Sequence, residues 1–253
     1  MTILQVRNLH KSFGGVHAVA DVSFCVAAGE LLALIGPNGA GKTTCFNLVN
    51  GQLAPDSGSI EMQGTSLVGK PPREIYRHGV GRTFQLTATF GSMSVRENVQ
   101  VALLSHGRML GTFLSSLENK FHNETNQLLD QVGMRAQAGR PCAELAYGDL
   151  KRVELAVALA SRPRLLLMDE PTAGMAAAER SELMQLATDL ARNSSIAVLF
   201  TEHDMEVVFR HADRVIVLSE GALIAQGTPA EVRADALVRQ VYLGDSDMEP
   251  GHA

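Results

Sequence analysis

Residues 36–43 read Gly36-Pro37-Asn38-Gly39-Ala40-Gly41-Lys42-Thr43. This is the pattern G-x-x-x-x-G-K-[ST], a phosphate-binding loop. Its glycines let the backbone fold into a nest of inward-pointing N–H groups, Lys42 can reach the β- and γ-phosphates, and the Thr43 hydroxyl can hold Mg²⁺. The apolar run Leu31–Ile35 predicts a buried strand before the loop, and Lys42–Val49 predicts a helix whose positive end faces the anion.

Length and composition fit a globular protein with its own hydrophobic core. The chain has 253 residues, of which 45% are hydrophobic, enough for one large α/β domain or two small ones. No stretch approaches the ~18 apolar residues that a membrane span needs. The first residues lack a signal-peptide layout. Three scattered cysteines, Cys25, Cys45 and Cys142, lack metal-site spacing. We therefore expect a cytoplasmic protein in a reducing compartment.

The charge balance restricts the class of partner. The net charge is −5, from 22 Lys and Arg against 27 Asp and Glu. The sequence has neither a basic run nor a stripe of alternating basic and aromatic residues. This argues against nucleic acid as the main partner and against electrostatic docking on an anionic membrane. We expect any membrane link to run through a protein partner.

The pattern of apolar residues and turn signals predicts alternating strands and helices around a helical middle. A capping box, Ser94-Val-Arg-Glu97, opens one helix of the middle part. The alternation implies a mostly parallel sheet covered on both faces. We expect one domain of residues 1–253, with an α/β core at about 1–85 and 160–227, a helical subdomain at about 86–159 and a helical tail at 228–253. The predicted strands are Ile3–Val6, Val22–Val26, Leu31–Ile35, Ser59–Met62, Leu165–Met168, Ile196–Phe200, Val215–Leu218 and Leu223–Ala225, and the main helices are Phe121–Val132, Leu150–Ala160, Ala177–Leu190 and Met205–Arg210.

Acidic residues at the end of a buried strand suggest the second half of a nucleotide site. Leu165–Met168 ends in Asp169 and Glu170. Asp169 can contribute to the Mg²⁺ site and Glu170 can polarise the attacking water. The alternative is a solvated acidic turn. His203 follows a strand expected beside that of Asp169, so it would face the same phosphates and orient the water.

Two further segments are candidates for the site. Gln85 leaves a strand and enters the helical part, where it could sense Mg²⁺ and relay its presence. The loop Leu145-Ala146-Tyr147-Gly148-Asp149 precedes a helix, and a helix N-terminus binds anions. One nucleotide does not need two such nests in one subunit, so we expect this loop to cover ATP held by a dimer partner. The alternative is an ordinary capped helix.

Together these residues resemble the ATP-binding subunits of ABC transporters over nearly the whole chain. Gly36–Thr44 is similar to Walker A, which adds Thr44 to the nucleotide contacts, and Leu165–Glu170 is similar to Walker B with its catalytic glutamate. Gln85 resembles the Q-loop glutamine, Leu145–Asp149 the signature, and His203 the switch histidine. The resemblance implies ATP and Mg²⁺ as ligands, with Lys42, Glu170 and His203 acting in catalysis. It also implies the P-loop NTPase (RecA-like) fold with an N-terminal antiparallel β part and an inserted helical subdomain.

Several segments narrow the resemblance to the larger ATPase subunit of branched-chain amino-acid importers. They are Lys11–Gly15, Phe46–Gly51, Arg82–Gln85, Leu145–Gly148 and Thr172–Met175. Val241–Gly244 is similar to that class and also to the lipopolysaccharide-export ATPase, whereas Arg82-Thr-Phe-Gln85 favours the importer. Phe13 lies where the family stacks an aromatic ring on adenine; its alternative is a core phenylalanine.

The signature departs from the common Leu-Ser-Gly-Gly-Gln. Ala146 replaces the serine that contacts the γ-phosphate, which removes a hydrogen bond worth ~1.5–3 kcal/mol if desolvated. Tyr147 replaces a glycine, and Asp149 replaces the glutamine and could cap the following helix. Ala176 stands where the family has an aspartate that contacts the dimer partner. We therefore expect a working ATPase of modest activity with weak dimer closure.

The resemblance implies an ATPase on the cytoplasmic face of a membrane, in a homodimer or with a paralogous subunit. Its partners would be permease subunits and, indirectly, a solute-binding protein. Phe90, Met93 and Val95 could line the docking groove for the permease, or pack inside the helical part. The rival functions are a phosphotransferase with a phosphate loop and a nucleic-acid-associated ABC protein.

Overall fold

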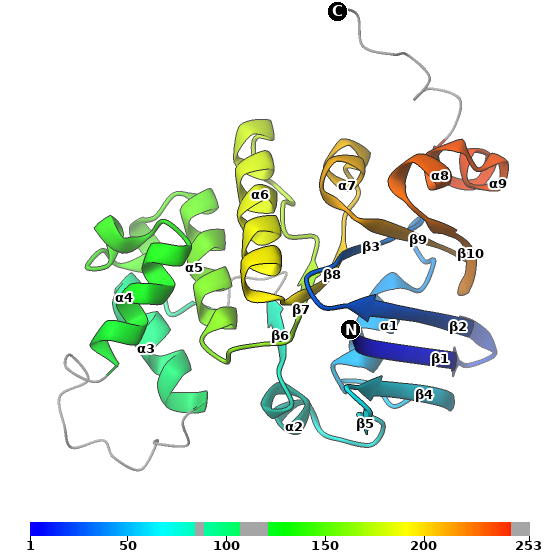
Figure 1. Cartoon of the computed structure of the whole chain (residues 1–253), viewed down its shortest axis with the longest axis horizontal. Helices are drawn as coiled ribbons and strands as arrows, with labels where there is room; N and C mark the ends of the chain where they lie inside the picture. The colour runs from blue at the N-terminus through cyan, green and yellow to red at the C-terminus, as the bar shows by residue number, and fades with distance from the viewer. Residues whose placement is uncertain (84–88, 107–120, 244–253) are drawn as a thin grey trace, which may run out of the picture.

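The computed structural model describes residues 1–83, 89–106 and 121–243. Its centre is a six-stranded sheet in the order β10-β9-β3-β8-β7-β6 (Figure 1). Neighbouring strands are parallel except β10, which is antiparallel to β9. All residues of β3, β7 and β8 are buried, as their apolar runs predict, including the polar residues Asp169 and Thr201 that end β7 and β8. The strand bounds are β3 Leu31–Ile35, β6 Val80–Thr83, β7 Leu165–Asp169, β8 Ala197–Thr201, β9 Arg214–Ser219 and β10 Ala222–Gly227.

The predicted fold class is confirmed, including the placement of β8 directly beside β7. Asp169 at the end of β7 pairs with Thr201 at the end of β8. Because both strands are parallel, their carboxyl ends meet at one edge of the sheet, where ligands of such sheets bind. The residues that follow these strands are therefore brought together there.

A second, antiparallel sheet has the order β2-β1-β4-β5. Its strands are β1 Thr2–Phe13, β2 Val16–Ala27, β4 Ser57–Met62 and β5 Thr65–Ser66. The hairpin strands β1 and β2 are much longer than the sequence predicted. Their register shifts between Val6 and Leu9, around Asn8 with a φ of 46°. This bulge breaks the alternation of buried and exposed side chains on which the prediction relied.

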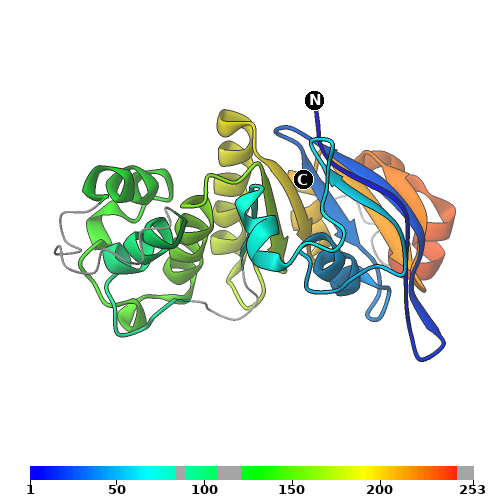
Figure 2. The same ribbon diagram turned by 90° about the horizontal axis from the view of Figure 1, so that it is seen from below.

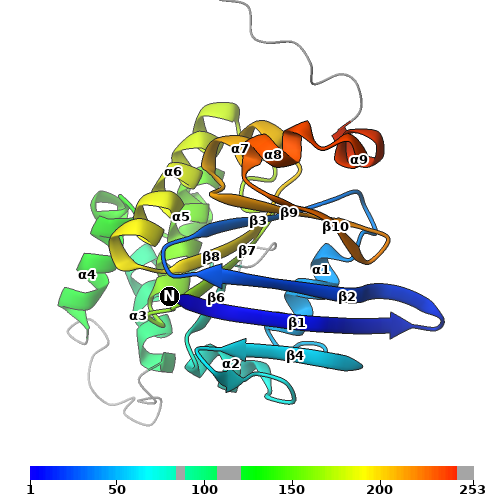
Figure 3. The same cartoon turned by 45° about the vertical axis from the view of Figure 1, so that its right-hand side comes forward.

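Helices cover both faces of the central sheet, and Figure 3 shows α1 (Lys42–Val49) between the two sheets. One core cluster joins α1 to both sheets, and the other lies on the opposite face of the central sheet. Figure 3 shows α6, α7 and α8 over that opposite face. The remaining bounds here are α2 Pro72–Arg77, α6 Ala177–Ser194, α7 Met205–His211, α8 Pro229–Ala234, α9 Ala236–Val238 and a π-helix Arg239–Leu243.

The middle of the chain is helical, as predicted. It contains α3 (Val95–His106), α4 (His122–Gln131) and α5 (Tyr147–Leu159), with 3-10 turns at Arg135–Gln137 and Cys142–Glu144. Figures 1 and 2 show α3, α4 and α5 grouped at the end of the molecule away from β1 and β2. The division into a core and a helical subdomain stays a prediction.

The predicted capping box at the start of α3 is confirmed. The Ser94 backbone N–H and hydroxyl donate to Glu97 Oε2 over 2.7 and 2.8 Å, and Glu97 N–H donates back to Ser94 Oγ. The backbone bond, followed by the hydroxyl, holds the pKa of Glu97 below its ordinary value. Helix α5 begins at Tyr147, earlier than predicted, because its apolar pattern starts only at Leu150.

The structure also describes the cysteines and the lengths of the helices. All three cysteines are free: Cys45 and Cys142 are buried, and Cys25 is half-buried. Burial raises the pKa of Cys45 to about 12. Within residues 1–83, 89–106 and 121–243, no helix combines the length and the apolar character that crossing a bilayer requires.

Candidate nucleotide site

The phosphate loop joins the end of buried strand β3 to the start of α1. Gly36, Gly39 and Gly41 have φ values of 147°, 80° and 101°, in the region that side chains rarely adopt. A Cβ on Gly36 would collide with the carbonyl oxygen of Leu218, and one on Gly41 with that of Ala18. The sequence therefore needs glycine at these points both for conformation and for space.

Lys42 occupies the inside of this loop. Its Nζ donates to the carbonyl oxygens of Gly36 over 2.6 Å and Pro37 over 3.0 Å, and the residue is buried. Burial lowers the pKa of Lys42, while the nearby charges of Glu170 and Asp169 oppose that shift. The loop thus holds a cation at its centre, and both acids predicted for the site lie near enough to act on it.

Asp169 ends β7 as a buried carboxylate with two partners. Thr201 of β8 donates its hydroxyl to Asp169 Oδ1 over 2.8 Å, and Arg82 of β6 donates to Oδ2 over 3.2 Å. Three neighbouring strands therefore fix the position of this carboxylate. The sequence carries no sign that Thr201 and Arg82 contact Asp169, because only the strand order brings them together.

Glu170 follows in a left-handed conformation, with a φ of 47°. Its N–H donates to both the hydroxyl and the carbonyl oxygen of Thr201, over 3.0 and 3.2 Å. These bonds hold a backbone conformation that is uncommon outside glycine. Glu170 Oε1 lies 2.9 Å from His203 Nε2. The predicted base and the predicted switch histidine are therefore in direct contact.

A buried acid, Glu202, links two segments beside the site and was not predicted. It accepts hydrogen bonds from the Thr172 backbone N–H over 2.9 Å and from its hydroxyl over 2.6 Å. It also accepts one from the His203 backbone N–H over 3.2 Å. Glu202 therefore connects the turn after Glu170 to the loop that carries His203.

The chain's C-terminal helices also reach the site. The Tyr242 hydroxyl forms a hydrogen bond with the Gly36 backbone; burial raises the pKa of Tyr242 despite this bond. Because this contact joins residues more than two hundred positions apart, no local pattern in the sequence predicts it.

The oxygen donors at the site fit Mg²⁺ bound together with a triphosphate. The Asp169 carboxylate and the exposed Thr43 hydroxyl are hard ligands of the kind that Mg²⁺ prefers. No cluster of three His, Cys, Asp or Glu side chains suited to a metal occurs in the part of the chain that the structure describes. Mg²⁺ is usually held by one or two carboxylates plus substrate phosphates, which agrees with this sparse donor set.

Comparison with known families agrees with this geometry. The ABC transporter family model matches residues 19–173, from β2 to the turn after Glu170. The chain belongs to the ABC transporter ATP-binding family. It is therefore an ATPase subunit of the kind that ABC transporters contain, as its sequence indicated. A second model, described as branched-chain amino acid ATP-binding cassette transporter, matches residues 222–247.

Individual relatives of this ABC cassette are similar over nearly their whole length. The high-affinity branched-chain amino acid transport ATP-binding protein LivG of Salmonella typhimurium is 38% identical, covering 96% of this chain and 98% of LivG. The lipopolysaccharide export system ATP-binding protein LptB of Acidithiobacillus ferridurans is also 38% identical, over 96% and 97% of the two chains. The ADP conformation of MJ1267, an ATP-binding cassette of an ABC transporter, has a TM-score of 0.87 at 29% identity and covers 97% of this chain and 100% of MJ1267.

The signature segment of the cassette lies at the start of α5, and Figures 1 and 2 place α5 and α1 in different parts of the molecule. Ala146 is the N-cap residue and offers no side-chain hydrogen bond. Tyr147 is exposed, with Lys151 Nζ 5.3 Å from its ring centroid. Asp149 does not cap the helix: it lies within the first turn and accepts a hydrogen bond of 2.8 Å from Gln137. The predicted capping role was wrong because α5 starts before Asp149.

Other predicted positions of the cassette have mixed outcomes. Phe13 is 46% exposed at the tip of the β1–β2 hairpin, so it is not a core phenylalanine. Gln85 lies outside the described residues, and its role stays a prediction. Of the candidate docking residues, Phe90 is exposed, Met93 is half-buried and Val95 is buried. Val95 therefore packs inside the helical part.

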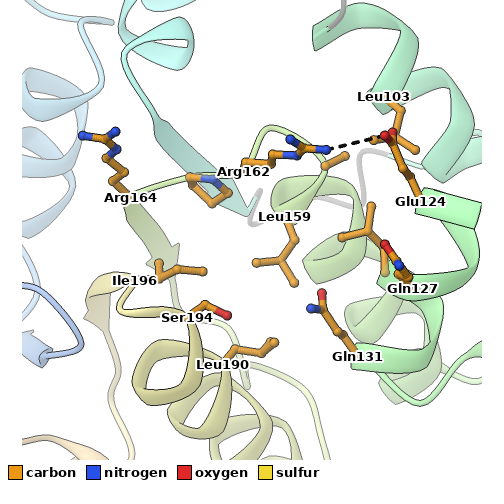
Figure 4. A pocket seen from close by; sticks show the side chains of 13 residues that line it. Leu103, Glu124, Gln127, Gln131, Leu159, Arg162, Arg164, Leu190, Ser194 and Ile196 are labelled. Atoms are coloured by element: carbon orange, nitrogen blue, oxygen red, sulfur yellow. Dashed lines mark ion pairs between the residues drawn. The ribbon is translucent and has the colours of Figure 1, made fainter. Parts of the chain in front are cut away.

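A cavity of about 390 Å³ lies elsewhere in the cassette, between α4, the connection from α5 to β7, and the end of α6 (Figure 4). Figure 4 shows Arg162 reaching across one side to Glu124, and the two side chains are 3.5 Å apart. None of the nucleotide-site residues named above lines this cavity.

Proposed function

We propose that this cassette binds and hydrolyses ATP to drive an importer of branched-chain or related amino acids. The observation that carries the proposal is the pairing of Glu170 with His203 over 2.9 Å, at the sheet edge that also presents Lys42. A carboxylate oriented by an imidazole beside a phosphate loop suits proton abstraction from water. The names of the relatives support the solute class.

Each residue of the site has a defined role in this proposal. Lys42 exchanges the Gly36 and Pro37 carbonyl oxygens for phosphate oxygens, while the loop N–H groups bind the same phosphates. Thr43 and Asp169 would hold Mg²⁺, which when bound neutralises charge on the phosphates. Gln85, outside the described residues, would sense that site.

Glu170 then takes the proton of the attacking water, and His203 fixes the orientation of its carboxylate. His203 would also contact the γ-phosphate. Glu202 accepts hydrogen bonds from the backbone N–H groups of His203 and Thr172, so the position of His203 is coupled to the turn after Glu170. Phe13, exposed at the hairpin tip with Lys11 Nζ 5.5 Å from its ring centroid, would stack on adenine.

A second subunit would complete the site through its Ala146–Asp149 segment. This segment lies at the start of α5, away from α1 of its own chain. The second subunit is another copy or a paralogue. ATP would join the two subunits and hydrolysis would separate them, and the movement would pass to permease subunits at the cytoplasmic face of the membrane. An external solute-binding protein would deliver the amino acid.

Phosphate release from ATP tests the catalytic assignment. Glu170→Gln is expected to lower turnover by about 10²-fold or more, the range for loss of a general base, while ATP binding persists. Glu182→Gln is the matched control, because Glu182 pairs with Arg152 over 2.7 Å on the surface of the helices. Equal turnover in the Glu170 and Glu182 variants would contradict the proposal.

Two further measurements test binding and assembly. Lys42→Ala is expected to abolish nucleotide binding, and normal ATP turnover in that variant would reject the site. Glu170→Gln with ATP is expected to sediment as a dimer, and a monomer at high protein and ATP concentrations would count against the two-subunit site. Co-purification from the native membrane would identify the permease and the partner subunit.

The rival functions predict different dependences in the same phosphate assay. A phosphotransferase would release no phosphate without a small-molecule acceptor. A nucleic-acid-associated ATPase would require DNA or RNA for turnover. A lipopolysaccharide-export ATPase, favoured by the similarity to LptB, would co-purify with export rather than amino-acid permease subunits.

A further inference from the structure

An arginine shares the carboxylate that the proposed function assigns to Mg²⁺. Arg82 Nη2 of β6 lies 3.2 Å from Asp169 Oδ2, and their side chains are 16% and 5% exposed. None of the tasks proposed above for the nucleotide-site residues falls to this arginine. A pair so shielded from water interacts strongly, because little solvent screens it.

The guanidinium of Arg82 is held from two sides. Its Nη1 donates to Asn47 Oδ1 over 3.0 Å and to Gln52 Oε1 over 3.2 Å. Asn47 belongs to α1, the helix that begins with Lys42 of the phosphate loop. The rigid fork of arginine therefore joins the phosphate-loop helix to the acidic end of β7, and its charge cannot be removed by deprotonation.

The charge of Arg82 matters most when no metal is bound. Asp169 and Glu170 both act electrostatically on Lys42 of the phosphate loop, so both carboxylates lie near the region proposed to receive the phosphates. Without a cation on Asp169, its negative charge would repel the triphosphate. Arg82 supplies that cation, and Mg²⁺ supplies one when it is present.

We propose that Arg82 is a positioning residue that neutralises Asp169 in the metal-free site, so that ATP binds there without Mg²⁺. The inference rests on the proposed nucleotide site and adds a residue to it. It predicts that loss of the Arg82 charge weakens ATP binding when Mg²⁺ is absent and much less when Mg²⁺ saturates the site, since the metal then neutralises Asp169 directly.

The experiment measures the Kd of ATP for the full chain in EDTA and in saturating Mg²⁺. The quantity compared is the Kd in EDTA divided by the Kd in Mg²⁺. In Arg82→Gln this ratio is expected to rise by about tenfold or more, which corresponds to the loss of one hydrogen bond to a charged group. Arg82→Lys keeps the charge and is expected to stay near the wild-type ratio. Arg214→Gln is the control, because Arg214 forms a half-buried pair with Glu30 over 2.7 Å where β9 begins, at the opposite edge of the sheet.

The outcomes separate this inference from the proposed function. If Arg82→Gln leaves the ratio unchanged, whether or not ATP binding weakens in both conditions, Arg82 has only a structural role. The inference is then wrong, while the proposed nucleotide site stands. If Arg82→Gln does not fold, a ratio in Arg82→Lys raised tenfold would overturn the inference, and a wild-type ratio would support it. If the wild-type chain binds no ATP in either condition, the inference and the proposed function both fail.

Discussion

We predict a large effect for Thr201, which holds both acids of the site through one hydroxyl. Its buried hydroxyl donates to Asp169 Oδ1 over 2.8 Å and accepts from the Glu170 N–H over 3.0 Å. Thr201→Val keeps the shape of the side chain and removes both bonds. The Glu170 N–H still donates to the Thr201 carbonyl oxygen over 3.2 Å. Asp169 Oδ1, however, loses its hydrogen bond from the hydroxyl in a site with little access to water.

The expected cost of Thr201→Val follows from those two bonds. A buried hydrogen bond to a charged group is worth about 1.5–3 kcal/mol, so we expect a loss of about 2–3 kcal/mol in the free energy of unfolding. For a chain of this size, about 2–4 °C of Tm per kcal/mol gives a drop of roughly 4–12 °C. Turnover is expected to fall about tenfold or more, because each acid loses one of the hydrogen bonds that position it.

Thermal unfolding and phosphate release measure the two effects. Thr188→Val is the matched control: this threonine is also buried, but its hydroxyl donates over 2.8 Å to the Met184 carbonyl within α6, where the backbone already provides helix bonds. We expect a smaller drop in Tm and unchanged turnover for the control. The reasoning would be refuted if Thr201→Val lost no more stability and no more activity than Thr188→Val.

The remaining predictions concern pH dependence and the signature. Burial and the charge of Arg210 lower the pKa of His211, so the unfolded chain takes up a proton at a higher pH than the folded one. The contribution of His211 to the free energy of unfolding is therefore fully present above its ordinary pKa of 6.5, and it is lost as the pH falls below that value. Urea unfolding at several pH values measures this dependence, and in His211→Gln the free energy of unfolding is expected to fall less steeply with decreasing pH. The same pH dependence in the variant and the wild type would disprove the prediction. Ala146→Ser gives α5 a capping hydroxyl worth about 1 kcal/mol and restores the family's serine, so both Tm and ATP turnover should rise. A rise in Tm alone would mean that the segment caps a helix but does not contact ATP.

Local patterns predicted most of the elements and the phosphate loop. The run from Leu31 to Lys42 combines a buried strand, obligatory glycines and a helix start, and each of these is encoded by neighbouring residues. The capping box at Ser94 is equally local. The prediction was wrong where a long-range feature interrupts the pattern, as at the bulge around Asn8, or where a helix begins in a polar turn, as α5 does at Tyr147.

The sequence by itself determined that the chain binds a nucleotide, and which acids and histidine could serve it. Only the tertiary structure decided what holds those groups. Thr201 and Arg82 reach Asp169 because β8, β7 and β6 are neighbours in the sheet, and Tyr242 reaches Gly36 from the far end of the chain. Such partners follow from strand order and helix docking, which depend on burial across the whole chain and leave no periodic signal along it.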